Sequence, residues 1–167
     1  MAIPSDPQPR ESARHIDTDV LRGMLDSTGK DDLHAVGKHL SNSTRKTDPL
    51  GVSIPAIGEA FHTLSESNQK VNSSTCGDAA IELRRLVQNG KLMLVGVGGS
   101  NEVYSIARDL TNSDDHLTSL DALILSVACL CKSCHTFYTS DSTLLNSISI
   151  SEIAEEHDVR VLPPPSF

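Results

Sequence analysis

The chain has 167 residues, of which 38% are hydrophobic, which is enough for one domain with a full core and too few for two. The formal net charge of −8 is concentrated in residues 111–167, where eight acidic residues accompany only two basic ones. Such a segment repels nucleic acid unless cations neutralise it, and the longest apolar run, near residues 122–130, is too short to cross a membrane.

The N-terminal residues, MAIPSDPQPRESAR, contain prolines and charges where a secretory signal would have an apolar core. We therefore expect a disordered lead-in over residues 1–13, one folded domain over residues 14–163, a short tail over residues 164–167, and a cytoplasmic protein.

Apolar periodicity along the chain alternates between strand and helix. Strands are predicted at residues 14–17, 50–55, 91–97, 135–141 and 159–165, the third of them buried. Helices are predicted at residues 20–25, 31–45, 55–64, 78–88, 102–110, 119–130 and 142–157, with a polar loop at 65–75. Five strands with helices between them predict an α/β fold, a single three-layer α/β/α domain around a mostly parallel five-stranded sheet.

The glycine-rich segment GVGGSNE, residues 96–102, lies between a predicted strand and a predicted helix. A glycine turn before a helix can bind phosphate. This segment lacks the Lys-Ser/Thr pair of a P-loop and the G-x-G-x-x-G spacing. We therefore favour an ordinary turn in which Ser100 or Asn101 caps the helix.

Cys129, Cys131, Cys134 and His135 have spacing that superficially resembles a zinc site. The first two cysteines lie in an apolar run, however, and the sequence offers no second ligand pair at zinc spacing. We predict that these cysteines are buried as small apolar side chains.

Four acidic residues lie where predicted strands end or helices begin. Asp17 and Asp141 end the first and fourth strands, Glu59 lies about one turn into a helix, and Asp121 opens another helix. Each one alone is explained by a helix N-terminus. In a parallel sheet, however, they converge at one edge, where their mutual repulsion would be relieved by Mg²⁺ or Mn²⁺.

The Asp17-x-Asp19 pair also resembles the first motif of haloacid-dehalogenase phosphatases, in which one Asp attacks phosphorus and the other is an acid/base. That chemistry needs a later Lys at a strand end. Lys132 lies in a loop after a predicted helix, so the match is partial.

The segments IDTDVL, VSIPAIGE, LDALILSVA and FYTSD, in this order, resemble the PIN-domain nucleases over residues 14–163. The resemblance implies a metal-dependent ribonuclease, often the toxin of a toxin–antitoxin pair and a homodimer. It assigns an acidic tetrad that holds Mg²⁺ or Mn²⁺ to Asp17, Glu59, Asp121 and Asp141. Thr18 and Ser140 would offer hydroxyls to water or phosphate. Asp19 stands where the family often has Asn or Ser, which implies a first-turn or outer-shell role.

The sequence leaves the roles of two further sets of residues open. Phosphate contacts could come from six basic residues, or these could be solvated helix faces: Arg22, Lys38, Arg45, Lys46, Arg84 and Arg85. Five apolar residues could form a dimer or antitoxin face, or simply the core: Leu21, Met24, Leu25, Leu33 and Leu40. A PIN-like fold can also be a non-catalytic interaction scaffold, although four converging acids favour activity.

Overall fold

The computed structural model describes residues 12–68, 74–96 and 101–165. Its five-stranded sheet has the order β3-β2-β1-β4-β5, and every neighbouring pair is parallel. The strands are β1 (Arg14–Ile16), β2 (Leu50–Ser53), β3 (Leu92–Val95), β4 (Thr136–Tyr138) and β5 (Arg160–Leu162). The first strand of the chain is thus the central strand of the sheet, with β2 on one side and β4 on the other.

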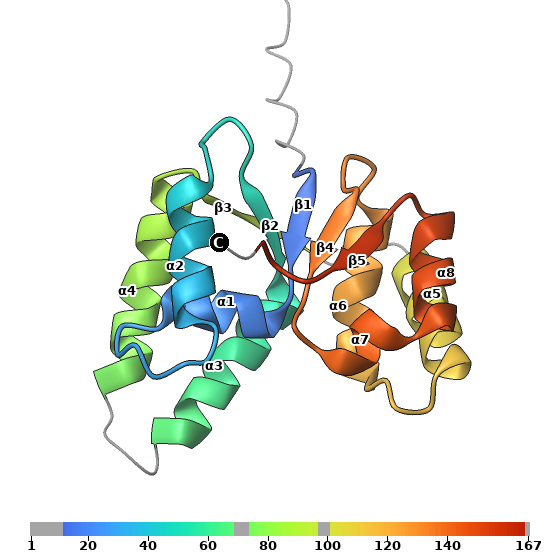
Figure 1. Ribbon diagram of the computed structural model, residues 1–167, viewed down its shortest axis with the longest axis horizontal. Helices are drawn as coiled ribbons and strands as arrows, with labels where there is room; N and C mark the ends of the chain where they lie inside the picture. Colours follow the sequence, from blue (N-terminus) through green and yellow to red (C-terminus); the bar gives the residue numbers. More distant parts are fainter. Residues whose placement is uncertain (1–11, 69–73, 97–100, 166–167) are drawn as a thin grey trace, which may run out of the picture.

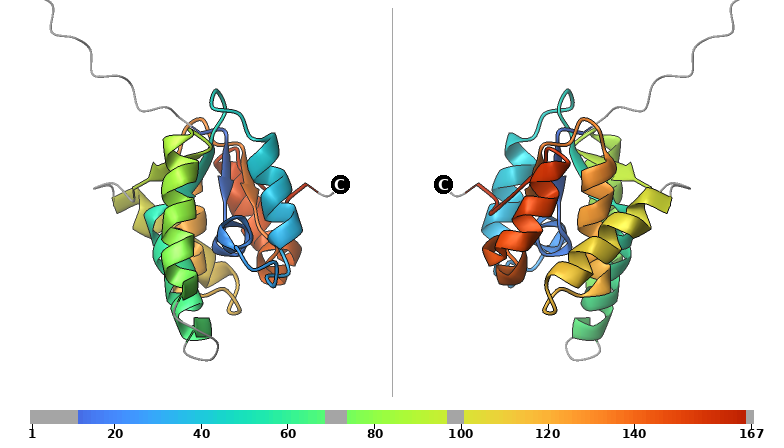
Figure 2. Two further views of the ribbon diagram at one scale, coloured as in Figure 1. Left: turned by 90° about the vertical axis from the view of Figure 1, so that its left-hand side faces the viewer. Right: turned by 90° about the vertical axis from the view of Figure 1, so that its right-hand side faces the viewer.

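Helices cover both faces of this sheet (Figures 1 and 2). Figure 2 shows α2 and α8 on one side and α3, α4, α5 and α6 on the other. The helices are α1 (Thr18–Leu25), α2 (His34–Ser43), α3 (Ile54–Asn68), α4 (Ser74–Gln88), α5 (Asn101–Ser113), α6 (Ser119–Leu130), α7 (Ser142–Asn146) and α8 (Ile148–Glu156). The predicted three-layer α/β/α architecture is confirmed, with a sheet that is parallel throughout.

The core is mainly aliphatic, in keeping with a sequence that has three Phe, two Tyr and no Trp. Among its fully buried side chains are Ile16, Leu21, Met24, Leu40, Leu50, Leu86, Leu110 and Leu125, with Phe137 the one large aromatic. Leu21, Met24, Leu25 and Leu40 are all at most 1% exposed and Leu33 packs partly buried against the core. These residues therefore form the core, and the alternative in which they make a dimer or antitoxin face is wrong.

Several predicted boundaries differ from the structure. The predicted polar loop is largely helical, because α3 continues to Asn68 and α4 starts at Ser74. The sequence between carries no proline, and Ser65 and Glu66 in the continued part of α3 are exposed, while residues 69–73 lie outside the described residues. The predicted helix over 142–157 breaks at Ser147, which ends α7 and also caps α8 by accepting the Ile150 N–H.

The third strand is not buried as predicted. Leu94 is 45% exposed, because β3 pairs only with β2 and lies at the edge of the sheet. Part of the glycine-rich turn, residues 97–100, lies outside the described residues, as do 1–11 and 166–167. The domain also begins earlier than predicted, since Ser12 is fully buried and its Oγ is 2.7 Å from the Pro49 carbonyl oxygen.

Helices α1 and α2 cross with their backbones in close contact. A Cβ built on Gly37 would collide with the backbone of Gly23 and Met24, and one built on Gly23 would collide with the backbone of Leu33. The two glycines thus bring α2 down onto α1, which lies at the edge of the sheet where β1 ends.

Two of the three cysteines that were predicted to be buried are so: Cys129 is 6% exposed and Cys134 is 3% exposed, whereas Cys131 is only partly buried. Burial raises the pKa of the Cys129 and Cys134 thiols to about 12. A thiol that resists ionisation is a poor metal ligand and a poor nucleophile. No helix within the described ranges is long and apolar enough to span a membrane.

Candidate active site

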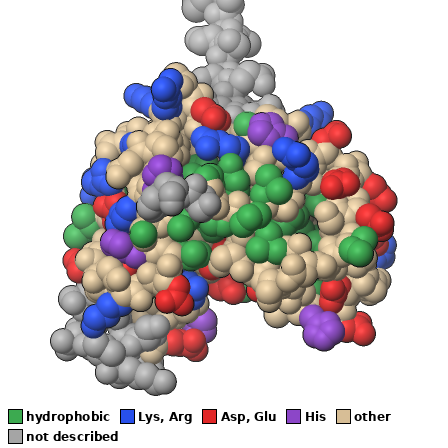
Figure 3. Space-filling model, viewed as in Figure 1, with side chains coloured by type: hydrophobic (Ala, Val, Ile, Leu, Met, Phe, Trp, Pro, Cys, Tyr) green, Lys and Arg blue, Asp and Glu red, His purple; other side chains and the backbone are tan. Residues whose placement is uncertain are grey.

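Five carboxylates lie at the edge of the sheet where the parallel strands end. Asp17 follows β1 and caps α1, and Asp19 lies in the first turn of the same helix. Glu59 lies in the second turn of α3, Asp121 in the first turn of α6, and Asp141 caps α7. Figure 1 shows these four helices meeting at the lower edge of the molecule. In Figure 3, acidic side chains lie along this lower margin, where the surface is notched.

Asp17 is the buried centre of the cluster, with 4% of its surface exposed. Its Oδ1 accepts the Thr18 N–H at 2.8 Å, and its Oδ2 accepts the Thr139 hydroxyl at 2.8 Å. The same Thr139 oxygen accepts the Asp141 N–H at 3.0 Å. One fully buried hydroxyl therefore connects the acid that follows β1 with the acid that follows β4.

Asp19 forms a similar set of hydrogen bonds, but to Ser140, the residue after Thr139 in the loop that follows β4. Its Oδ1 accepts the Val20 N–H at 2.7 Å, and its Oδ2 accepts the Ser140 N–H at 2.8 Å together with the Ser140 hydroxyl. Both oxygens of Asp19 are thus engaged. The Ser140 hydroxyl therefore has a protein partner in place of the water or phosphate expected for it.

Threonine hydroxyls also hold Glu59 and Asp121. Thr18, expected to face water or phosphate, instead donates to Glu59 Oε2 at 2.6 Å. Thr118 donates to Asp121 Oδ2 at 2.7 Å and accepts the Asp121 N–H at 3.1 Å. Sequence reasoning missed Thr118, although Thr three residues before an acid at a helix start is the signal of a capping box.

Burial, together with neighbouring acids, raises the pKa of two members of the cluster, Asp17 and Asp121. Burial raises the pKa of Asp17 to about 7, and the charges of Asp19 and Asp121 add to this against the lowering effect of its hydrogen bonds. Burial also raises the pKa of Asp121, with contributions from Glu59, Asp141 and Asp19. The structure therefore brings all four predicted acids together, with Asp19 beside them.

No basic side chain is among the groups that shift either pKa. Several of the candidate phosphate-binding cations are engaged elsewhere: Lys38 Nζ donates to the Met24 carbonyl at 2.8 Å, and Arg85 pairs with Glu82 at 2.7 Å. Arg45 and Lys46 precede β2 and so lie toward the opposite edge of the sheet. The negative charge at the acidic edge is left to be balanced by something other than these residues.

The donor set fits a hard divalent cation, since carboxylate oxygens are the ligands that Mg²⁺ and Mn²⁺ prefer. The carboxylates are not already arranged around a metal position. Within the described ranges, no group of three Asp, Glu, His or Cys side chains is placed to hold a metal ion. Hydrogen bonds to hydroxyls and helix N–H groups hold the carboxylates instead. The same finding gives no support to a zinc site at Cys129, Cys131 and Cys134.

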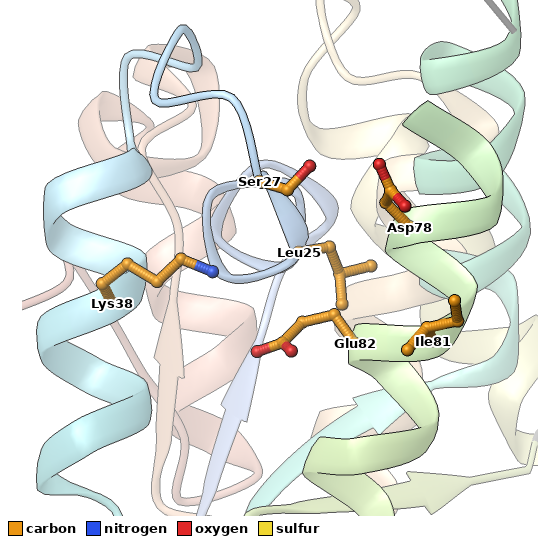
Figure 4. A pocket seen from close by; sticks show the side chains of 6 residues that line it. All are labelled: Leu25, Ser27, Lys38, Asp78, Ile81 and Glu82. Carbon is orange, nitrogen blue, oxygen red and sulfur yellow. The ribbon is translucent and has the colours of Figure 1, made fainter. Parts of the chain in front are cut away.

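A separate pocket of about 350 Å³ lies between the end of α1, α2 and α4 (Figure 4). Its lining residues are Leu25, Ser27, Lys38, Asp78, Ile81 and Glu82. None of the five clustered acids contributes to this lining, and the pocket plays no part in the site described above.

No protein-family model matches the sequence, and no curated protein matches it either. Solved structures do match in fold. The toxin VapC20 of Mycobacterium tuberculosis, which cleaves the sarcin–ricin loop, is 18% identical with a TM-score of 0.60, covering 88% of this chain and 98% of its own. A chain of VapBC2 of Rickettsia felis, bound to promoter DNA, is 12% identical with a TM-score of 0.56, covering 90% and 97%.

A chain of FitAcB of Neisseria gonorrhoeae is 17% identical with a TM-score of 0.55, again covering 90% of this chain and 97% of its own. At such identities the likeness concerns the fold, and it extends over nearly the whole of each chain. The sheet order 3-2-1-4-5, parallel throughout and covered by helices on both faces, matches that of PIN domains. The chain therefore has the PIN-domain fold that its four sequence segments predicted.

Proposed function

We propose that this chain is a metal-dependent endoribonuclease that cleaves single-stranded RNA and acts as the toxin of a toxin–antitoxin pair. The observation that carries the proposal is the cluster of Asp17, Glu59, Asp121 and Asp141, brought from four elements to one sheet edge. Among the described residues, no basic side chain contributes to the raised pKa of Asp17 or Asp121. The fold likeness to a toxin that cleaves the sarcin–ricin loop favours RNA as the substrate.

In this proposal the four acids hold Mg²⁺ or Mn²⁺ between them. Such an ion lowers the pKa of a coordinated water and neutralises charge on the scissile phosphate. The chain's own part is to orient the acids, which Thr139, Thr18 and Thr118 do for Asp17, Glu59 and Asp121. A hydroxyl can do this without cancelling the negative charge that attracts the ion.

The phosphatase alternative is less well supported. It requires Asp19 as a proton donor and acceptor beside a nucleophilic Asp17, yet both oxygens of Asp19 are bonded to Val20 and Ser140. A phosphatase would lose its activity in Asp19→Asn, whereas the nuclease would keep most of its activity.

The proposal includes two protein partners. Two of the structural matches are of VapBC2 and FitAcB, and an antitoxin encoded beside this chain is the corresponding expectation. A homodimer is the second. Light scattering of the purified chain, alone and co-expressed with the protein encoded next to it, measures both stoichiometries.

The deciding experiment is calorimetric titration with Mn²⁺ alongside cleavage of a fluorogenic single-stranded RNA. We expect wild type to bind Mn²⁺ and to cleave only when metal is present. Asp17→Asn, Glu59→Gln, Asp121→Asn and Asp141→Asn should each lose both, because each removes a charged oxygen ligand. Circular dichroism should show that the fold is retained.

A matched control is Glu152→Gln, which removes one exposed carboxylate from α8 and should leave binding and cleavage unchanged. Metal binding with no cleavage of any RNA tested would reject the nuclease while keeping the metal site. Absence of Mn²⁺ binding in wild type would reject the proposed function and leave a scaffold with helix-capping acids.

A further inference from the structure

The motif Asp17-Thr18-Asp19 places two carboxylates in the first turn of α1, and both bind the loop that leaves β4. In each aspartate, Oδ1 accepts the N–H of the following residue and Oδ2 accepts a hydrogen bond from the loop. The loop donor is Thr139 for Asp17 and Ser140 for Asp19. The paired residues are more than 120 positions apart in the chain. Two successive contacts of the same kind therefore fix this loop against the start of α1.

We propose that Asp19 is a positioning residue, a fifth carboxylate that places Asp141 for the metal by fixing the Ser140 peptide. This inference rests on the proposed function. Ser140 directly precedes Asp141, so the orientation of the Ser140 backbone decides where the Asp141 side chain starts. Asp19 binds Val20 and the Ser140 peptide, and in this proposal it acts through the loop and is not a ligand of the ion.

Hydrogen bonds that do not involve Asp19 also hold the loop after β4, and they leave only the Ser140 peptide for Asp19 to fix. Thr139 is held by its hydroxyl bond to Asp17 and by a bond from its N–H to the Leu162 carbonyl at 3.0 Å. Asp141 is held by its N–H bond to Thr139 and by its Oδ1, which accepts the Leu144 N–H at 3.0 Å. Between them, Ser140 is exposed, and its backbone N–H bonds to Asp19. Without Asp19 this peptide would face water and could rotate.

The test separates the geometry of Asp19 from its charge. Asp19→Asn keeps an oxygen that can accept from Ser140 and removes the charge, whereas Asp19→Ala removes both. Outer-shell partners of metal ligands typically contribute 10- to 100-fold in affinity. We therefore expect Asp19→Ala to bind Mn²⁺ roughly 10- to 100-fold more weakly than wild type, with Asp19→Asn clearly tighter than Asp19→Ala.

Two further variants complete the design. Ser140→Ala loses the hydroxyl bond and keeps the N–H bond, so its Mn²⁺ affinity should lie between wild type and Asp19→Ala. Asp48→Ala removes an aspartate that pairs with Arg14 at the other end of β1, 3.1 Å away, and should leave the affinity unchanged. Thermal unfolding without metal shows whether each variant is folded, and Ser140→Ala keeps the test valid if Asp19→Ala is not.

The outcomes are distinct. Equal Mn²⁺ affinities for Asp19→Asn and Asp19→Ala, with wild type binding normally, would overturn the positioning role and leave the proposed nuclease intact. No Mn²⁺ binding by wild type would overturn both. Rescue of affinity by Asn relative to Ala would support the positioning role, because a merely electrostatic contribution of Asp19 is lost equally in both variants.

Discussion

At the scale of single residues, the acidic site could be predicted because each acid borders a recognisable strand end or helix start. Asp17, Glu59, Asp121 and Asp141 were assigned from the sequence, and the structure brings them to one edge. The hydroxyls that hold them were mostly not predicted. Thr139 meets Asp17 across 122 positions and Thr18 meets Glu59 across 41, and no local pattern encodes such partners.

The burial of His15 is another feature that the sequence does not reveal. Its ring is 2% exposed and lies on Gly51 of the neighbouring strand, where any Cβ would collide with it. Burial lowers the pKa of His15 from 6.5 to about 4. Its Nε2 has no hydrogen-bond partner among the described residues.

This histidine predicts a pH-dependent loss of stability. Below pH 6.5 the unfolded chain binds a proton at His15, whereas the folded chain stays neutral there until about pH 4. The free energy of unfolding should therefore fall as the pH drops through that window, by roughly 3 kcal/mol in total from this residue. Urea denaturation at several pH values, comparing wild type with His15→Gln, measures this.

The comparison with His15→Gln is needed because Asp17 acts in the opposite direction. Its pKa is raised to about 7, so protonation of the folded chain adds stability as the pH falls below 7. That contribution is common to both proteins and cancels in their difference. Denaturation curves that shift in parallel with pH would contradict the role given to His15.

At the scale of elements, the sequence predicted the type of nearly every helix and strand, because periodicity reports which side of an element meets the core. It could not report how closely two elements approach. The contact between α1 and α2 depends on Gly23 and Gly37, whose missing Cβ atoms let the backbones touch. Likewise, the exposure of β3 follows from strand order, which apolar content alone does not specify.

This contact predicts opposite effects of the same substitution at two helical glycines. Gly37→Ala should lower the free energy of unfolding by about 1–3 kcal/mol, because α2 must move away from the α1 backbone. Gly77→Ala in α4, where a Cβ meets no atom within 4 Å, should raise it by about 0.5–1 kcal/mol through helix propensity. Denaturant titration of both variants checks this, and equal effects would refute the close-contact explanation.

At the scale of the whole molecule, the two edges of the sheet have different roles. The acids occupy the edge where strands end, whereas Ser12 anchors the chain at the edge where they begin, with its Oγ 2.7 Å from both the Arg14 and Pro49 carbonyl oxygens. Residues before Ser12 therefore join the domain on the side away from the site.

This separation predicts that removal of residues 1–11 leaves Mn²⁺ affinity and RNA cleavage unchanged. Extending the change to Ser12→Ala should lower the free energy of unfolding by about 1–3 kcal/mol, since a buried hydrogen bond is lost. Calorimetry and thermal unfolding of the two proteins distinguish these effects. A loss of cleavage in the shortened protein, with stability unchanged, would show that the leading residues serve the site.

The central position of β1 has a consequence for synthesis on the ribosome. The first strand to leave the exit tunnel can pair with β2, which in turn pairs with β3, but its other side waits for β4, which is made more than 100 residues later. Asp141 reaches Asp17 only through that pairing. A nascent chain would therefore carry an incomplete acidic site until its last strands emerge, and a nuclease assembled in this order would stay inactive toward RNA while it is being translated.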